Sequence, residues 1–123
     1  MKSTKKRITT SLAVLLLLAC SSKSEDEPSC PNDLPAACPS SGEPSYATTI
    51  QPILRSRCRS CHSAEGEAGT THVFDSYAEV FAERRVVLSQ VFACAMPPVK
   101  ADQLSEEERA ALLAWLVCGA PNN

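Results

Sequence analysis

The sequence predicts an all-α domain with about three helices and little strand. Three features of the 123-residue chain favour this fold class. Apolar residues recur at helical spacing in three segments, the last segment begins with a strong helix-start signal, and no strand-rich stretch lies between them. A chain of this length accommodates one domain with a tail.

The first residues are typical of a bacterial export signal. A basic start from Met1 to Arg7 precedes an apolar run over residues 12–19. This run is too short to span a bilayer, which needs roughly 20 apolar residues, so we predict a signal peptide over residues 1–19. The tetrapeptide that ends at Cys20, Leu-Leu-Ala-Cys, resembles a lipobox, whose cysteine becomes the lipidated N-terminus. Ordinary secretion with Cys20 as a spare thiol is the alternative.

Export changes the charge of the chain. Cleavage before Cys20 removes four of the 12 basic residues and none of the 14 acidic ones, which leaves a formal net charge of −6. Nucleic acid is therefore not an expected partner, because its phosphates attract the opposite charge. An anionic membrane surface offers no long-range attraction either. The predicted link to the membrane is the lipid on Cys20.

Residues 20–45 are predicted to form a disordered, lipid-anchored tether. Ser, Pro, Glu, Asp and Asn dominate from Ser21 to Ser45. Such a segment buries too little apolar surface to offset its ordering entropy, so we expect a spacer with no binding role. The folded domain is predicted to span residues 46–123, which is small for a self-sufficient core.

The first predicted helix runs from about Thr49 to Cys61. Thr49 is a suitable N-cap, and it places Pro52 in the first turn, where the missing N–H matters little. One face carries apolar residues at helical spacing: Ile50, Ile53, Leu54 and Cys58.

The second predicted helix runs from about Asp75 to Val91, with Asp75 or Ser76 as its cap. Apolar material recurs along it: Tyr77, Val80, Phe81, Val87, Leu88 and Val91.

The third predicted helix has the clearest signals. Ser105 and Glu108 form a capping box, and the acidic residues between them suit the helix dipole. Apolar side chains then lie at positions i, i+3 and i+4, and Gly119 is well placed to end the helix. These apolar residues are Leu112, Trp115 and Leu116, and we expect Trp115 to be core packing.

A five-residue motif ends the first predicted helix: Cys58-Arg59-Ser60-Cys61-His62. C-x-x-C-H is the attachment signature for a c-type haem. Two thiols at this spacing lie on one side of a helical turn, so both can add to the vinyl groups of one haem. The imidazole of His62 then lies under the iron as its proximal ligand. We predict one covalent haem c attached to Cys58 and Cys61.

Met96 is the candidate distal ligand. Apart from Met1 it is the only methionine, and Pro97 and Pro98 follow it. Pro97 biases Met96 toward an extended conformation that presents its side chain, and a thioether on the second face of the iron raises the reduction potential. Two alternatives are open: Met96 as packing filler, and His72 as the distal ligand.

Two other uses of the motif fit less well. A thioredoxin-like dithiol needs a βαβ context, which the helical surroundings do not provide. A zinc site needs further ligands; His72 and Cys94 could supply them, but zinc gives no role to Met96. The neighbouring arginines could contact haem propionates or a redox partner, and a solvated helix face explains them equally well: Arg55, Arg57 and Arg59.

The cysteine count supports the haem assignment. The chain has seven cysteines. With one assigned to lipid and two to haem, four remain, and we predict the pairs Cys30–Cys38 and Cys94–Cys118. Sequence alone does not prove this pairing.

The chain resembles the class I monohaem cytochromes c of the small bacterial type. The resemblance covers Tyr46 to Ala120 and depends on the motif after an amphipathic helix, a middle helix, Met96-Pro97-Pro98 and a capped last helix with an aromatic residue. It implies a small cytochrome c-like fold wrapped around one covalently bound haem. It also implies thioether bonds at Cys58 and Cys61, with His62 and Met96 as the iron ligands. A Cys94–Cys118 bridge is not general in that family, and we expect it to hold the Met96 loop.

These expectations combine into one predicted function. The protein would be an electron carrier, not an enzyme, cycling its iron between Fe(II) and Fe(III) with envelope redox proteins as donor and acceptor. It would be lipid-anchored and face the periplasm, and Ser21 after the lipidated cysteine resembles an outer-membrane sorting signal. The alternatives are a haem enzyme or sensor with an open or bis-His distal site, and a non-haem thiol or metal-binding lipoprotein.

Overall fold

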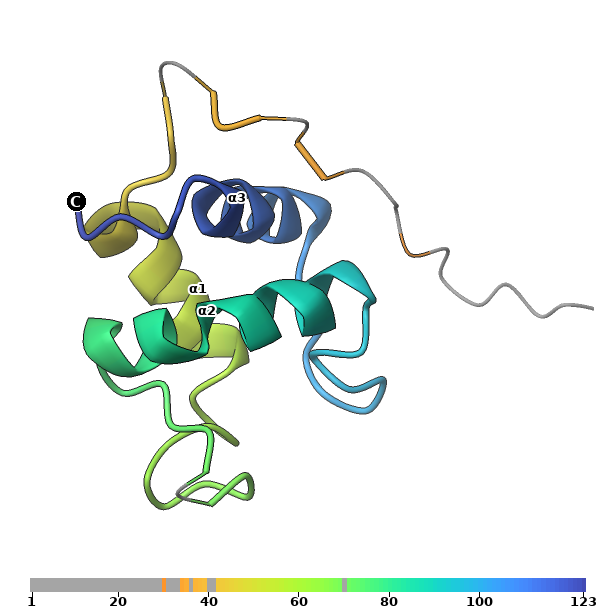
Figure 1. The fold of residues 1–123 in the computed structure, drawn as a ribbon. Coiled ribbons are helices and arrows are strands. Elements are labelled where there is room, and N and C mark those ends of the chain that lie inside the picture. Colours follow the sequence, from red (N-terminus) through yellow and green to blue (C-terminus); the bar gives the residue numbers. More distant parts are fainter. Residues whose placement is uncertain (1–29, 31–33, 36, 40–41, 70) are drawn as a thin grey trace, which may run out of the picture.

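The computed structural model describes residues 30, 34–35, 37–39, 42–69 and 71–123 (Figure 1). The predicted signal peptide and Cys20 lie outside these residues. No helix among the described residues is long and apolar enough to cross a membrane.

The described chain is all-α, as the sequence predicts. A π-helical turn, η1 (Tyr46–Ile50), continues directly into α1 (Gln51–Arg57), and α2 (Tyr77–Phe92) and α3 (Glu106–Val117) follow. No strand occurs in these residues. In Figure 1 the connections after α1 and after α2 both project from the same side of the helices.

The start and end of the first helix differ from the prediction. Ser45 rather than Thr49 is the N-cap, and its hydroxyl accepts a hydrogen bond from the Thr48 amide at 3.4 Å. The regular helix ends at Arg57, so the haem motif lies on turns. The amides of Cys58 and Arg59 both donate to Leu54 O, and this shared acceptor ends the i→i−4 pattern.

The other two helices begin at complete capping boxes. Ser76 caps α2, with Glu79 returning the hydrogen bond, and Ser105 caps α3 with Glu108. Ser76 was one of two predicted caps, and the box at Ser105 is confirmed. Gly119 has φ +86, the left-handed conformation that commonly ends a helix.

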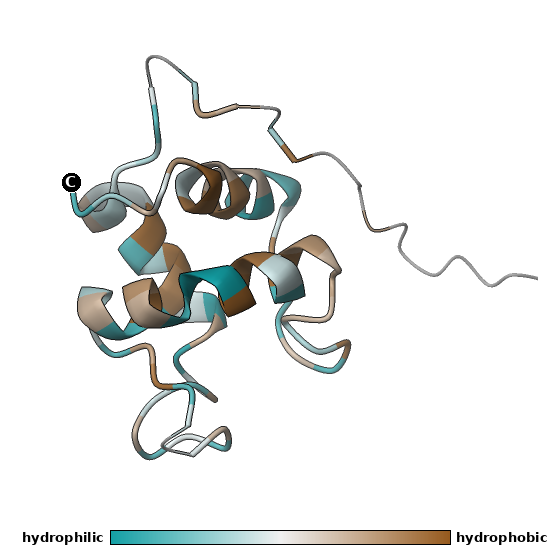
Figure 2. Cartoon of the chain, viewed as in Figure 1, coloured by the Kyte–Doolittle hydropathy of each residue, from teal (hydrophilic) through white to brown (hydrophobic). Residues whose placement is uncertain are grey.

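One end of the domain has a closed aromatic core. Trp115 is fully buried, its ring stacks on Tyr46 at 5.7 Å, and Tyr46 meets Tyr77 edge-on at 5.0 Å. The residues after α3 complete it, because Trp115 Nε1 donates to Pro121 O and the Tyr77 hydroxyl donates to Ala120 O. Figure 2 shows hydrophobic residues in each of α1, α2 and α3 beside hydrophilic ones, as expected of helices that bury one face.

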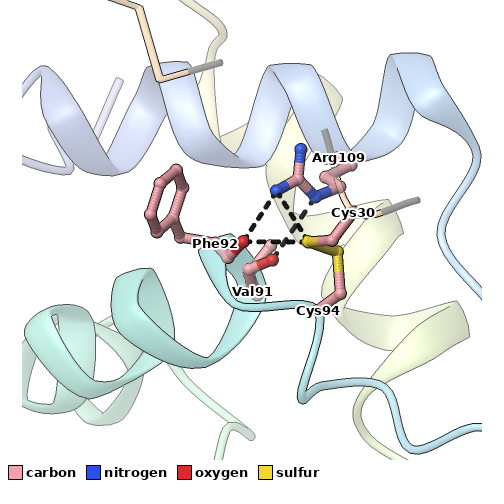
Figure 3. Close-up of a disulfide and its surroundings, with 5 residues drawn as sticks. All are labelled: Cys30, Val91, Phe92, Cys94 and Arg109. Atoms are coloured by element: carbon pink, nitrogen blue, oxygen red, sulfur yellow. Dashed lines mark hydrogen bonds between the residues drawn. A yellow bond between two sulfur atoms is a disulfide. The ribbon is translucent and has the colours of Figure 1, made fainter. Parts of the chain in front are cut away.

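The predicted disulfide pairing is wrong. The bridges are Cys30–Cys94, with 5.8 Å between Cα atoms, and Cys38–Cys118, with 4.8 Å. Cys94 follows the end of α2 and Cys118 follows the end of α3. The end of each helix is therefore joined by a disulfide to a different cysteine of the segment before η1. Two residues of the predicted tether are thus covalently joined to the domain. Figure 3 shows the first of these bridges.

Candidate functional site

A largely apolar cavity of about 750 Å³ lies between the loop after α1, the last turns of α2 and the loop after α2. All four predicted site residues line it, although they come from segments far apart in the chain. The lining residues used below are Cys58, Cys61, His62, His72, Phe74, Gln90, Val91 and Met96.

The turns of the motif bring both thiols and the imidazole to this cavity. The amides of Cys61 and His62 donate to Cys58 O at 3.2 and 2.9 Å, so the chain folds back over Cys58. Among the described cysteines, Cys58 and Cys61 are the ones that keep free thiols. Two free thiols on one apolar wall are available for covalent attachment of a ligand.

Burial affects the ionisation of one of these thiols. Burial, with smaller contributions from the neighbouring Cys61 and the Glu108 carboxylate, raises the pKa of Cys58 to about 11. Cys58 is therefore a neutral thiol at physiological pH, which suits an apolar wall.

His62 is held in one orientation by its surroundings. Its Nδ1 lies 2.9 Å from His72 O, and a carbonyl can only accept, so Nδ1 carries the proton. The ring stacks on Phe74 at 4.6 Å, and the Phe74 amide donates to His62 O at 2.7 Å. The Nε2 lone pair is thereby left available for a metal, an arrangement typical of ligating histidines.

His72 lies on the same side of the cavity as His62. Its carbonyl contacts the His62 ring, and its own Nδ1 lies 3.5 Å from a Glu83 carboxylate oxygen. This placement assigns His72 a supporting contact with His62 and disfavours it as the ligand that faces His62 across an iron.

Met96 lies on the loop after α2. Its amide and that of Ala95 both donate to Gln90 O, at 3.2 and 2.9 Å, so the loop turns tightly off the helix. The side chain is 39% exposed and lines the cavity. A thioether here is both at the cavity and close to its opening.

Two residues that were not predicted to belong to the site hold the turns of the Cys58–His62 motif in place. A Cβ on Gly66 would lie 2.1 Å from Cys61 O, so only glycine allows the loop to pass this close. Asp75, one of the two predicted caps of α2, instead accepts from Arg59 Nε at 2.7 Å and from the Ala64 amide at 3.2 Å. These two hydrogen bonds hold the pKa of the Asp75 carboxyl below its usual value.

The arginines beside the motif have protein partners. Arg57 Nε lies 3.0 and 3.2 Å from the two carboxylate oxygens of Glu108, which joins α1 to α3. Both side chains remain partly exposed, at 30% and 24%, so this pair contributes about 1 kcal/mol or less. Arg59 pairs with Asp75. Arg57 also lines the cavity, whereas Glu108, Arg59 and Asp75 do not.

The residues present fit a haem. Binding cavities for cofactors and small molecules are mostly apolar and about 300–1,000 Å³ in volume, a range that includes this one. Two thiols, an oriented imidazole and a thioether are the donor set of a c-type haem with Met/His ligation. Cys58 and Cys61 could hold its edge, and His62 and Met96 its iron.

A family model matches most of the described domain. The model of the family described as cytochrome c oxidase, cbb3-type, subunit III matches residues 46–116. No curated protein and no solved structure matches the chain. The matched residues include η1, the haem motif, the whole cavity wall and nearly all of α3.

Proposed function

The chain belongs to the family of cytochrome c oxidase, cbb3-type, subunit III, so it contains a cytochrome c domain, and from this premise we propose that it is an electron-transfer protein carrying one covalent haem c. The observation that carries the proposal is the convergence of Cys58, Cys61, His62 and Met96 on one apolar cavity. The bound haem iron supplies reversible one-electron exchange.

The chain's residues have distinct roles in this proposal. Cys58 and Cys61 attach the group covalently, and the His72 carbonyl keeps the His62 ring turned so that Nε2 is free to bind. Met96 would supply the second iron ligand, and an iron with both axial positions filled would have no open position for a substrate. The apolar walls exclude water, which favours the less charged, reduced state and supports a moderate to high reduction potential.

The location and partners belong to the same proposal. The basic and apolar start of the chain and the lipobox at Cys20 support export and a lipid anchor in the bacterial envelope, facing the periplasm. Ser21, directly after the proposed lipidated cysteine, supports an anchor in the outer membrane. Other envelope redox proteins would donate and accept the electron, and the family name makes a terminal oxidase one candidate acceptor. We assign no enzymatic activity to the chain.

The test is the optical spectrum of the protein produced in a periplasm that matures c-type cytochromes. Wild type is recorded oxidised and reduced beside Met96→Ala and Val99→Ala. Val99 lies three positions further along the same loop, is 91% exposed and does not line the cavity, so it is the matched control.

We expect covalent haem in all three proteins and a thioether–iron band that disappears only in Met96→Ala. Covalent haem without this band in wild type would favour an open distal site, and with it catalysis or sensing. A chain without covalent haem would contradict the proposal as a whole.

A further inference from the structure

The end of α2 is bound by a side chain from α3. Arg109 donates from Nη2 to Phe92 O at 2.9 Å and from Nε to Val91 O at 3.3 Å (Figure 3). The last carbonyls of a helix have no partner within the helix, and a cation there also interacts favourably with the helix dipole. Arg109 therefore stabilises the position where α2 stops.

A disulfide reaches the same position from the opposite end of the sequence. Cys30 is bonded to Cys94, two residues after the helix ends, and Cys30 Sγ lies 3.1 Å from Phe92 O. The guanidinium of Arg109 lies 3.7 Å from the same sulfur. Figure 3 shows Arg109 and the disulfide side by side over residues 91–94.

This position determines where Met96 lies. Cys94 has φ +52, a left-handed conformation that is uncommon for a residue with a Cβ and persists when its surroundings hold it. The next two amides, those of Ala95 and Met96, turn back onto Gln90 O. The direction in which the chain leaves α2 toward the cavity is therefore set between residues 91 and 94.

We propose that Arg109 and the Cys30–Cys94 disulfide, together called the clamp, are positioning elements that hold Met96 at the iron. The proposal depends on Met96 being a ligand, as stated under the proposed function. The clamp keeps the fraction of molecules with a detached Met96 small. A ligand that competes with Met96 binds only to this detached fraction, so its apparent affinity rises in proportion to that fraction.

The second disulfide is a matched control. Cys38–Cys118 closes a sequence separation of 80 residues against 64 for Cys30–Cys94, so the two bridges constrain the unfolded chain to nearly the same extent. None of these four cysteines lines the cavity, but Cys94 lies on the loop that carries Met96, whereas Cys118 follows α3. Loss of either bridge should lower stability similarly, whereas only loss of Cys30–Cys94 should release Met96.

The experiment compares carbon monoxide binding to the reduced, haem-loaded protein in Cys30→Ser/Cys94→Ser and in Cys38→Ser/Cys118→Ser. We expect the affinity to rise about tenfold in the first variant, within the range of coupling between linked sites. In the second we expect a change of less than about twofold, because distant sites act independently.

Variants of Arg109 test the clamp with both disulfides intact. Arg109→Met keeps an apolar stem and removes the hydrogen bonds to Val91 O and Phe92 O, and Arg109→Lys retains one charge without the two-pronged geometry. We expect weakened thioether–iron absorption and raised carbon monoxide affinity in Arg109→Met, with partial rescue in Arg109→Lys.

Amide hydrogen exchange separates this proposal from the proposed function. The amides of Ala95 and Met96 should exchange faster in the clamp variants than in wild type or in Cys38→Ser/Cys118→Ser. Equal effects in the two double variants, or none in either, would overturn the clamp. A wild type without the thioether–iron band would instead overturn Met96 ligation. The amide exchange rates of Ala95 and Met96 would then show whether the clamp still orders the loop when Met96 is not a ligand.

Discussion

The two ends of this small domain are built in opposite ways. At one end, η1, α2 and α3 enclose Ile50, Leu112 and Trp115 without any exposure to solvent. At the other, loops surround a cavity whose wall includes the half-buried Cys58, Cys61 and His62. Figure 1 shows the contrast between the crossing helices and the two loops beside them.

The difference shows which part of the core the chain completes by itself. About 75 residues offer too little apolar surface for two closed cores, and small domains usually need an additional element for stability. Here the aromatic end is closed by side chains, and the cavity end has the volume and donors for a covalently held group. We therefore expect changes at the aromatic end to alter stability and changes at the cavity end to alter the haem.

Removal of the attachment thiols should give the largest effect. In Cys58→Ala/Cys61→Ala we expect no covalently bound haem, because no other free thiol lines the described part of the cavity. Haem staining of the denatured protein measures this directly. Ser60→Ala, between the two cysteines, is the control and should retain haem. Covalent haem in the double variant would contradict the assignment of Cys58 and Cys61 as the attachment residues at the cavity end.

Trp115→Ala should be the most damaging single change at the aromatic end. The side chain is fully buried, stacks on Tyr46 and donates to Pro121 O. Loss of a buried aromatic of this size lowers the free energy of unfolding by about 3–5 kcal/mol, which denaturant titration of the haem-loaded protein would measure.

The matched variant Trp115→Phe keeps a ring and loses the hydrogen bond, so its free energy of unfolding should fall by less, about 1 kcal/mol. The spectrum of the folded haem protein should be the same in both variants. A weakened thioether–iron band at low denaturant would show that the two ends are not independent.

Gly66→Ala should affect the cavity end by an intermediate amount. The new Cβ meets Cys61 O at 2.1 Å, so the backbone must move, and overpacking of this kind costs about 1–3 kcal/mol. Because Cys61 precedes His62, the proposed proximal ligand, we expect a shift in reduction potential together with the loss of stability.

Gly69→Ala is the control for this change. Gly69 has φ +62 but open space around its Cβ position. Alanine there should lower stability through backbone strain without moving the reduction potential. Equal shifts in reduction potential in the two variants would count against a specific role for the close approach of Gly66 to Cys61.

Asp75→Asn should give the smallest effect, visible as a change in pH dependence. The Arg59 hydrogen bond, followed by that from the Ala64 amide, lowers the pKa of Asp75 in the folded state. A lowered pKa contributes stability that is present above the ordinary value of 3.8 and lost as the pH falls through the folded pKa. Thermal unfolding between about pH 2 and pH 6 should therefore depend less on pH in the variant than in wild type. An identical profile in both proteins would remove this role for Asp75.

Local signals predicted the helices better than the site loops. The capping boxes at Ser76 and Ser105 depend on residues three positions apart, so sequence pattern is enough to find them. The end of the first helix was placed too late, because the amides of Cys58 and Arg59 share one carbonyl, a feature without a sequence signature. The role of Gly66 was missed for the same reason, since its constraint is a backbone approach from Cys61.

The sequence by itself determined the chemistry that this protein can perform. The spacing of Cys58, Cys61 and His62 and the presence of one internal methionine are properties of the chain itself, and they predict a haem and its ligands without knowledge of the fold. Periodicity and capping determined three helices in the same way, because these are interactions within a few residues.

Only the tertiary structure decided how these groups are held. The pairing of Cys30 with Cys94 and of Cys38 with Cys118 depends on which helix ends lie beside the N-terminal segment, a contact across 64 and 80 residues. The hydrogen bond from His62 to the His72 carbonyl and the reach of Arg109 to the end of α2 are likewise products of folding. Contacts between distant segments depend on the packing of whole helices, and the local pattern of a sequence does not encode that packing.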